Sequence, residues 1–397
     1  MTNPSVSERQ DRDLGQPTPL LGGLSPAVFM RDHWQKKPLL VRGAWPEVQP
    51  PLDAAQLRRW CQQEGVESRL IQRSGPGDEA GWTLKHGPLK RRDWPGDGAT
   101  RWTVLMQGVD THLDAARALL DRFDFIPAAR LDDLMISLAA DGGGVGPHVD
   151  AYDVFLLQVS GQRRWRIGPV ADARIRPGLP LRILADFTPT VDEVLNPGDM
   201  LYLPPHYGHD GIAVGDGCMT CSVGFRSPRG LGLASQVLQR LLDDLDLDSV
   251  AFDDTENPIY TDPDQAATAQ GARIPPQMLA FMRQHLARLL DEGDALGEAL
   301  GSLLSEPKPD TVFDAPGKVS PTNGGGVRLA RATRMLYGEG GALFINGESF
   351  EASGPDLLLL QRLADTRQLA AQDVQRLTPD ARAILQDWLD DGWLHGT

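Results

Sequence analysis

A histidine and an aspartate with metal-ligand spacing, His148 and Asp150, stand at the start of the run HVDAYDVFLLQVSG. If this run is a strand, side chains two residues apart point to the same face and could bind one ion together. A buried charge is costly unless it is paired or coordinates a metal. The pair therefore belongs either to an ordinary polar surface hairpin or to a metal site, and a third ligand would favour the metal site.

The segment NPGDMLYLPPHYGHDG (196–211) offers two histidines for the third position. It predicts a Gly-Asp turn, an apolar strand and a tight Pro-Pro turn before His209, an order typical of double-stranded β-helix barrels. Two histidines and one carboxylate form the facial triad of non-haem Fe(II) oxygenases, which leaves coordination positions open. We therefore expect His209 as the ligand. His206 should lie near the rim as a structural or substrate-binding residue, although in a turn the two histidines could exchange roles.

Arginines follow on the next predicted strand, in the run QRRWRIG (162–168). Alternation places Arg163 on one face with Trp165 and turns Arg164 and Arg166 to the solvated face. If the first face points into the barrel, the Arg163 guanidinium can bind a carboxylate through two parallel hydrogen bonds. Oxygenases that use 2-oxoglutarate need such a cation for the distal carboxylate of this cosubstrate. The alternative is that Arg163 is solvated too.

The elements that must position these residues are short strands. From about 133 to 226, β segments alternate with Gly/Pro turns, which predicts a sandwich or barrel. Before them, Ser25 and Pro26 signal the start of a helix that should end before Pro38. The other N-terminal elements are expected as a strand directly after Pro38, a helix at 51–63, a strand at 101–109 and a helix at 112–123.

Composition and charge are those of a folded protein of two or three domains, with 397 residues, of which 41% are hydrophobic and 23% charged. The net charge of −15 repels nucleic acid and anionic membranes and favours basic partners. The first residues lack the apolar core of a signal peptide, and no apolar run is long enough to span a bilayer. We expect a cytoplasmic protein that binds neither membrane nor DNA directly.

The three cysteines, Cys61, Cys218 and Cys221, are too few for a disulfide framework, which suits a reducing compartment. Cys218 and Cys221 have the spacing of half a zinc site, but the sequence has no second pair. On a strand, residues three apart point to opposite faces. We therefore interpret both as core residues.

Three regions are predicted along the chain. The middle one carries 6 Lys+Arg against 15 Asp+Glu, and its stretch 241–264 holds nine acids and no base. The regions are a mainly β catalytic domain with an N-terminal helical extension (1–227), an acidic helical segment (228–310) and a winged-helix-like α+β module (311–397).

The last module follows a Pro/Gly-rich linker at 306–326. Alternating segments come first, and helices are expected around 355–370 and 379–391. A regulator whose barrel senses a small molecule and whose winged helix binds DNA is one alternative function. However, residues 316–397 carry 8 Lys+Arg against 10 Asp+Glu, whereas DNA-binding modules are basic.

The runs DGGGVGPHVDAYDVFLLQVSGQRRWRIG, GDMLYLPPHYGHDG, SVGFRSP and MRDHWQKKPLLVRGAW resemble JmjC-type cupins. More narrowly, they are similar to bacterial ribosomal oxygenases that hydroxylate an arginine of a large-subunit ribosomal protein. The resemblance implies Fe(II) at His148, Asp150 and His209, 2-oxoglutarate at Arg163, and homodimerisation through the middle helices. It also places Ser222, or else Thr220, near the cosubstrate. The chain departs from the family at 206–208, where His-Tyr-Gly replaces Gly-Phe-Pro.

Substrate contacts are expected around the mouth of the pocket. Asp141 would hold a cationic substrate side chain, or else cap a turn. Tyr152 would shape the pocket or simply pack. An acidic rim suits a basic ribosomal protein as the substrate. The alternatives are an oxygenase for another protein side chain or tRNA, and a metal-dependent isomerase or sugar-binding cupin, which would rarely need Arg163.

Overall fold

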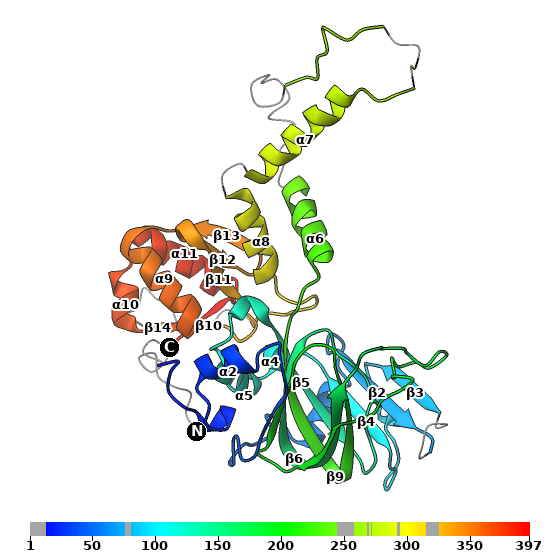
Figure 1. The fold of residues 1–397 in the computed structure, drawn as a ribbon. Coiled ribbons are helices and arrows are strands. Elements are labelled where there is room, and N and C mark those ends of the chain that lie inside the picture. Colours follow the sequence, from blue (N-terminus) through cyan, green and yellow to red (C-terminus); the bar gives the residue numbers. More distant parts are fainter. Residues whose placement is uncertain are drawn as a thin grey trace.

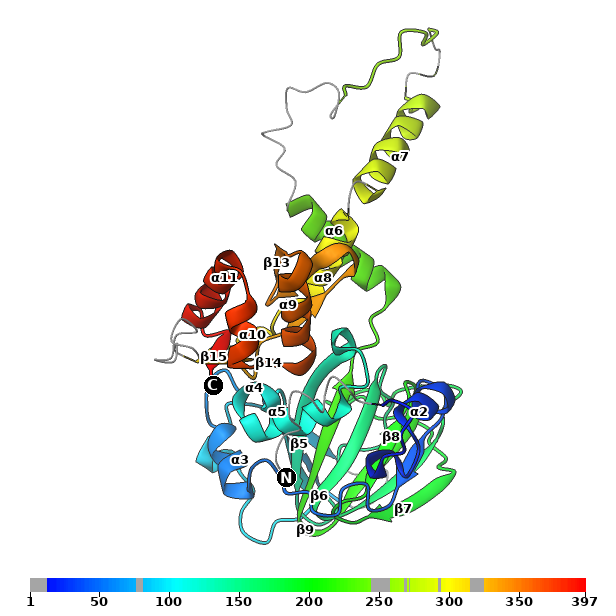
Figure 2. The same ribbon diagram turned by 90° about the vertical axis from the view of Figure 1, so that its left-hand side faces the viewer.

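The computed structural model contains a barrel, a group of helices that projects from it, and a C-terminal module beside the barrel (Figures 1 and 2). It describes residues 13–75, 81–243, 258–267, 270, 272–291, 294–314 and 325–397. None of the helices in these ranges combines the length and the apolar character that crossing a bilayer requires.

A sheet of nine strands forms the barrel, and this confirms the predicted mainly β domain. The strand order is β1-β8-β6-β9-β5-β4-β2-β3, with β7 paired to β6. The strands are β1 (Leu39–Val41), β2 (Ser68–Arg73), β3 (Trp82–His86), β4 (Trp102–Met106), β5 (Leu131–Ala139), β6 (Asp153–Pro169), β7 (Val191–Leu195), β8 (Met200–Leu203) and β9 (Tyr207–Phe225).

The two longest strands, β6 and β9, pair with each other along most of their length. The expectation of a turn and a new strand before Arg163 was wrong, because β6 continues without reversal. Its register with β9 shifts between Gln158 and Gln162, and Gly161 there has a φ of 59°. A bulge of this kind bends a strand while keeping it paired. Arg163 therefore lies on the same strand as the apolar run before it.

The N-terminal elements cover one side of the barrel, and the helices and strands predicted for this region are present. Helix α2 (Pro26–Asp32) begins at Ser25, whose Oγ accepts a hydrogen bond from the backbone N–H of Val28. Its Phe29 packs against the rings of Phe155 and Tyr202, with centroids 5.5 and 4.9 Å away. Helices α3 (Ala54–Trp60), α4 (Val109–His112) and α5 (Asp114–Leu120) complete this side.

The two cysteines of β9 lie on opposite faces of the sheet, as predicted. Both are free and buried. Cys221 belongs to the large core beneath the N-terminal helices, whereas Cys218 packs in a separate small cluster with Ala139 and Ala213.

Three helices follow the barrel: α6 (Gly230–Asp243), α7 (Pro276–Asp291) and α8 (Ala295–Ser305). Helices α6 and α8 pack through Val237, Leu241 and Ala299. Helix α7 extends away from the body of the molecule (Figures 1 and 2). Most of the predicted acidic stretch 241–264 lies at 244–257, outside the described residues.

The C-terminal module has its own core, in which Leu363, Leu385 and Trp388 are buried. Of the predicted linker 306–326, the structure describes the ends but not 315–324. The module consists of a sheet of β14 (Gln368–Leu369), β10 (Val327–Leu329) and β15 (Leu394–Gly396), a sheet of β11 (Met335–Tyr337), β12 (Ala342–Ile345) and β13 (Glu348–Glu351), and helices α9 (Gly354–Thr366), α10 (Ala371–Arg376) and α11 (Pro379–Asp390).

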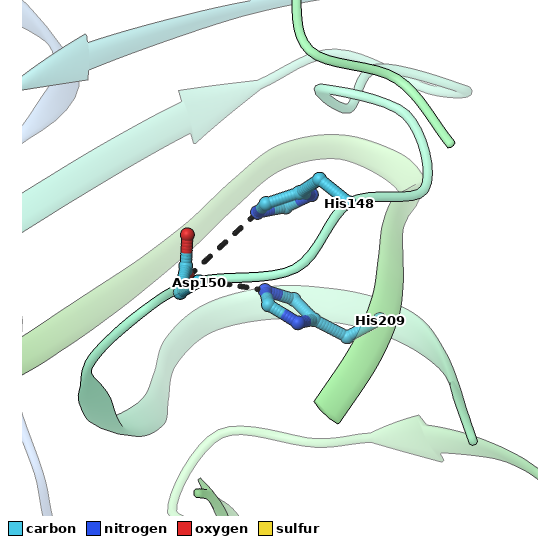
Figure 3. Close-up of side chains that lie close together, drawn as sticks. All are labelled: His148, Asp150 and His209. Carbon is cyan, nitrogen blue, oxygen red and sulfur yellow. Dashed lines mark ion pairs between the residues drawn. The ribbon is translucent and has the colours of Figure 1, made fainter. Parts of the chain in front are cut away.

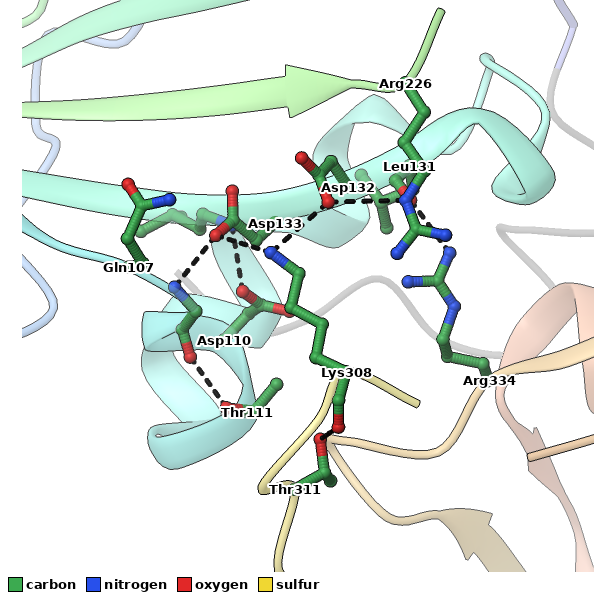
Figure 4. Close-up of polar contacts among 12 residues, drawn as sticks. Gln107, Asp110, Thr111, Leu131, Asp132, Asp133, Arg226, Lys308, Thr311 and Arg334 are labelled. Atoms are coloured by element: carbon green, nitrogen blue, oxygen red, sulfur yellow. Dashed lines mark hydrogen bonds and ion pairs between the residues drawn. The ribbon is translucent and has the colours of Figure 1, made fainter. Parts of the chain in front are cut away.

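The chain beyond α8 is tied to the barrel at the first residues of β5 (Figure 4). The Lys308 ammonium lies 2.8 Å from the carboxylate of Asp133 and 3.2 Å from that of Asp132. Arg334, from the C-terminal module, donates a hydrogen bond to the backbone oxygen of Leu131 (2.8 Å). The barrel and the C-terminal module therefore share a polar interface at one end of β5.

Lys308 faces a pair of buried acids at this interface. Asp133 accepts a hydrogen bond from the backbone N–H of Gly108, and Asp110 accepts one from Leu134. Burial raises the pKa of Asp110, and the nearby Asp133 carboxylate raises it further. Lys308 supplies a positive charge that compensates these groups and links the chain beyond α8 to the barrel.

Candidate functional site

The three residues expected to bind a metal, His148, Asp150 and His209, come together in the structure (Figure 3). Asp150 Oδ2 lies 3.9 Å from His148 Nε2 and 3.5 Å from His209 Nε2. One possible ligand atom from each residue lies within 4.8 Å of the other two. Among the residues that the structure describes, this is the one such group of three or more.

His148 and Asp150 lie in a loop before β6, and the expectation that they begin the strand was wrong. The backbone of His148 exchanges two hydrogen bonds with that of His209, at 3.0 and 2.9 Å. The N–H of His206 donates to the backbone oxygen of Asp150, and that of Leu184 donates to Pro147. The loop therefore pairs with the start of β9 and with the 170–190 segment, ahead of the first residue of β6.

Backbone carbonyl groups orient both imidazoles. His148 Nδ1 lies 2.9 Å from the oxygen of Gly146, and His209 Nδ1 lies 3.0 Å from that of Tyr207. A carbonyl only accepts, so Nδ1 carries the proton in each ring and Nε2 is left with a free lone pair. This arrangement is typical of metal-binding histidines.

The pKa values of the cluster suit metal binding near neutral pH. Burial and the adjacent His209 lower the pKa of His148 to about 4, so its ring is neutral. Burial acts to raise the pKa of Asp150, but the contact with His209, the adjacent His148 and the hydrogen bond from Tyr152 outweigh it and leave the pKa below its usual value. The residues thus offer neutral imidazole and ionised carboxylate, the forms that bind a divalent ion.

Two glycines next to the metal-binding histidines allow the 170–190 segment to pack directly on the loop of His148 and on the start of β9. A Cβ on Gly146 would lie 3.0 Å from Ile183. A Cβ on Gly208 would lie 2.4 Å from Val170 and 2.7 Å from Phe187. The role of this segment could not be predicted from the sequence, because its contacts are long-range and it contains no motif.

The cluster opens into a cavity of about 390 Å³. Its walls are largely apolar, with polar groups at a few positions. The main lining side chains are Arg69, Ile71, Leu84, Thr103, Leu105, Met135, Ser137, Val145, Val149, Tyr152, Val154, Leu156, Arg163, Trp165, Ile175, Leu181, Arg182, Thr220 and Ser222, together with the three cluster residues.

Arg163 lies inside this cavity on the same face of β6 as Trp165, and it is 4% exposed. Its Nε donates to Thr220 Oγ1 (3.0 Å), one Nη to the oxygen of Gly211 (3.2 Å) and the other to Ser137 Oγ (3.3 Å). All of these acceptors are neutral, and no carboxylate among the described residues pairs with the guanidinium. A buried cation without a counter-charge is costly, so the site is suited to an anionic ligand.

The two candidates for a polar group near the cosubstrate both line the cavity. Thr220 accepts from Arg163 and donates to Gln158 Oε1 (2.8 Å), which fixes its hydroxyl. Ser222 is 7% exposed, and no protein partner fixes its hydroxyl among the described contacts. Ser137 and Gln158 could not be predicted from the sequence, because strand pairing alone brings Ser137 to Arg163 and Gln158 to Thr220.

The other expected site residues fall in different places. Tyr152 lines the cavity, and burial together with Asp150 raises the pKa of its hydroxyl, which hydrogen-bonds to that carboxylate. Asp141 is not brought to the cavity: its Oδ1 accepts from the backbone N–H of Gly215 (2.8 Å), which is the turn-capping alternative. His206 is exposed at a φ of 62° and also lies outside the cavity.

Arg164 and Arg166 point away from the cavity, as predicted. Arg164 forms an exposed ion pair with Asp192, with an N–O distance of 2.6 Å. Arg166 is not merely solvated, because it pairs with the buried Asp210. Of the arginines in the run QRRWRIG, only Arg163 is therefore positioned for a ligand in this cavity.

Two family models match the chain. One, for the JmjC domain, matches residues 118–233, and the other, for a ROXA-like winged helix, matches residues 283–395. The first covers the metal cluster and Arg163, and the second covers the C-terminal module. Both matches confirm the predicted fold class.

Individual relatives match over nearly the whole length. The ribosomal protein uL16 3-hydroxylase of Escherichia coli K12 is 32% identical over 365 residues, which cover 87% of this chain and 90% of that one. A probable ribosomal oxygenase of Haemophilus influenzae is 30% identical and covers 93% and 96%. A structure of the E. coli ribosomal oxygenase YcfD with cobalt and 2-oxoglutarate superposes with a TM-score of 0.77 at 28% identity, over 94% of this chain and 98% of that one. The chain belongs to the JmjC-domain ribosomal oxygenases.

Proposed function

We propose that this ribosomal oxygenase depends on Fe(II) and 2-oxoglutarate and hydroxylates an arginine side chain of a large-subunit ribosomal protein. One observation carries the proposal: the His148, Asp150 and His209 ligand atoms and the uncompensated guanidinium of Arg163 share one cavity. A metal ion would bind the three ligand atoms, and a dianionic cosubstrate would supply the counter-charge for the guanidinium.

The ligand set fits Fe(II). Two imidazole nitrogens and one carboxylate on one side of an ion match the facial triad and leave positions for a cosubstrate and dioxygen. His148 and His209 would bind through Nε2, since their Nδ1 atoms face carbonyl oxygens. The hydrogen bond from Tyr152 would hold the Asp150 carboxylate in place.

The charges of the cavity fit 2-oxoglutarate. Its distal carboxylate would bind the forked N–H groups of Arg163, and its keto-acid end would face the metal ligands. Thr220 and Ser137 already hold the guanidinium in place, so little side-chain entropy would be lost on binding. We place Ser222 next to the cosubstrate as a further hydrogen-bonding group.

When bound, Fe(II) supplies the activation of dioxygen by which 2-oxoglutarate becomes succinate and carbon dioxide while one oxygen atom is inserted into a C–H bond. The protein's own residues orient and shield the reactants. Trp165 and Leu156 keep the cosubstrate site apolar, and the 170–190 segment closes one wall against water through Ile175 and Leu181.

An arginine of a ribosomal protein suits the site in two ways. Ribosomal proteins are basic, and a net charge of −15 favours their approach. The apolar wall formed by Ile71, Leu105, Met135 and Val154 can pack against the methylene groups of a long side chain. We propose Tyr152 as the substrate contact at the mouth, in preference to Asp141 and His206, which lie outside the cavity.

The decisive experiment is mass spectrometry of ribosomal proteins from cells with and without the gene. A mass increase of one oxygen atom on an arginine, present only with the gene, is expected. The same increase on another residue type or on tRNA would correct the substrate, and no difference in any of these would refute the proposed activity. A non-oxygenase cupin would leave ribosomes unchanged and would not require Arg163.

We also propose that the protein acts in the cytoplasm as a homodimer through its middle helices. No side chain of helix α7 whose burial the structure describes is buried, and Met278, Met282, Leu286 and Leu290 form one apolar stripe at a spacing of four. Leu242 at the end of α6 is 56% exposed. Sedimentation equilibrium should show a dimer that Leu286→Glu converts to a monomer; a monomeric unsubstituted protein would refute this.

A further inference from the structure

A second arginine lines the cavity without a compensating charge. Arg69, on β2, donates from one Nη to Gln107 Oε1 (3.2 Å). Its Nε is buried and has no hydrogen-bond partner in the described structure, and no carboxylate there pairs with it. A buried donor without an acceptor costs about 1–3 kcal/mol, so this side chain has hydrogen-bonding capacity that folding alone does not use.

Arg73 provides an internal comparison. It lies on the same strand and the same face, and its Nε is also buried without a partner. However, its guanidinium stacks over the ring of Trp82 at 5.7 Å, and it is not among the residues that line the cavity. Packing accounts for Arg73, whereas Arg69 has no aromatic partner of this kind among the described contacts and faces the cavity.

The cosubstrate does not account for Arg69. On the proposed function, the two ends of 2-oxoglutarate are taken by Arg163 and by the metal ligands. In the sheet order, β9, β5 and β4 separate the strand of Arg163 from the strand of Arg69. Arg163 reaches Ser137 on β5, and Leu105 on β4 lies in register between Ser137 and Arg69. Arg69 therefore lies beyond the residues that hold Arg163, where the molecule that enters after the cosubstrate can reach it.

The position of hydroxylation indicates which part of the substrate lies next to Arg69 in the cavity. The E. coli relative is named a 3-hydroxylase. In an amino acid, carbon 3 is bonded to the α-carbon, so bringing it to the metal also brings the main chain into the cavity. A peptide carbonyl buried there needs a hydrogen-bond donor, and the side chains next to Arg69 on this face, Ile71 on β2 and Leu105 on β4, offer none.

We infer that Arg69 is a substrate-binding residue whose guanidinium donates hydrogen bonds to main-chain carbonyl oxygens next to the hydroxylated residue. The inference rests on the proposed function and adds a contact that is independent of the substrate's side chain. Arg69 thus fixes the polypeptide backbone, while the apolar wall receives the side chain.

The test uses the full-length protein loaded with Co(II) and 2-oxoglutarate, and a fluorescent uL16 peptide that spans the hydroxylated residue. Anisotropy should show that Arg69→Met weakens peptide binding about tenfold or more, the usual effect of losing a hydrogen bond to a charged group. Arg69→Lys, which keeps a donor but not the fork, should lose less. The control Arg73→Met should bind the peptide like the unsubstituted protein.

Two further measurements separate binding from folding. The melting temperature of Arg69→Met should be no lower than that of the unsubstituted protein, since the substitution removes a buried donor without an acceptor. Its affinity for 2-oxoglutarate should be unchanged. Unchanged peptide binding in Arg69→Met would overturn the inference, as would weaker binding of 2-oxoglutarate in its place. If the unsubstituted protein bound no ribosomal peptide while binding Co(II) and 2-oxoglutarate, the proposed substrate would be refuted, and this inference with it.

Discussion

Replacing Arg163 with methionine should remove the stabilisation by 2-oxoglutarate and leave the ligand-free protein about as stable as before. The guanidinium is 4% exposed, and its acceptors are Thr220, Gly211 and Ser137, all neutral. The substitution loses these hydrogen bonds but also relieves an uncompensated buried charge, which costs several kcal/mol. Because the two effects oppose each other, the free energy of unfolding should change little.

The effect on the cosubstrate is much larger. Two charge-assisted hydrogen bonds to the distal carboxylate contribute about 1.5–3 kcal/mol each. Their loss corresponds to an affinity about 10² to 10⁴ times lower. At a concentration of 2-oxoglutarate about 100 times its Kd, the unsubstituted protein should gain about 2.7 kcal/mol in free energy of unfolding. The Arg163→Met protein should gain almost nothing there.

Urea unfolding with Co(II) present, with and without 2-oxoglutarate, measures both effects. Arg164→Met is the matched control, because its exposed ion pair with Asp192 should contribute little. A variant at Arg163 that binds 2-oxoglutarate normally would refute the cosubstrate site. A large loss of stability without ligand would show that Arg163 is structural.

Three further predictions concern the metal cluster and the interface. Because the pKa of His148 is lowered to about 4, the unfolded chain takes up a proton between roughly pH 6.5 and 4 that the folded metal-free protein does not. In urea unfolding, the free energy of unfolding relative to His148→Gln should therefore decrease by about 1.4 kcal/mol for each unit by which the pH is lowered within this range. A difference that stays constant over this range would contradict the prediction. Lys308→Met leaves the buried Asp133 carboxylate without its ion pair and should cost about 3 kcal/mol in the same assay, whereas Lys308→Arg should be mild; equal stability of both variants would argue against the interface. Gly208→Ala pushes a methyl group against Val170 and Phe187 and should weaken Co(II) binding about tenfold or more in a spectroscopic titration. Adding Val170→Ala and Phe187→Ala should restore part of that affinity, and no effect of Gly208→Ala would exclude the packing argument.

The metal cluster could be predicted because its information is local. His148 and Asp150 stand two residues apart, and His209 follows a Pro-Pro turn in a recognisable order of turn and strand. Strand alternation also placed Arg163 and Trp165 on one face, since the period of two holds on either side of the bulge. The class of fold followed from the same short segments.

Features that depend on long-range pairing could not be predicted. Nothing in the run SRLIQR marks Arg69, because its position in the cavity depends on how β2 pairs with β4 and how β4 pairs with β5. Asp141 was expected at the pocket mouth, yet its role as a turn cap depends on Gly215, 74 residues away. The bulge at Gly161 was taken for a turn, because glycine serves both.

The residues proposed to bind the metal and the cosubstrate lie on elements that the backbone holds with different rigidity. Arg163 and His209 belong to the paired ribbon of β6 and β9, which pack as one unit. His148 and Asp150 come from a short loop that a few backbone bonds attach to that ribbon. Metal exchange should therefore disturb only this loop and leave the binding site for the dicarboxylic acid intact. An enzyme whose iron is lost after a failed turnover could in this way be reloaded without refolding.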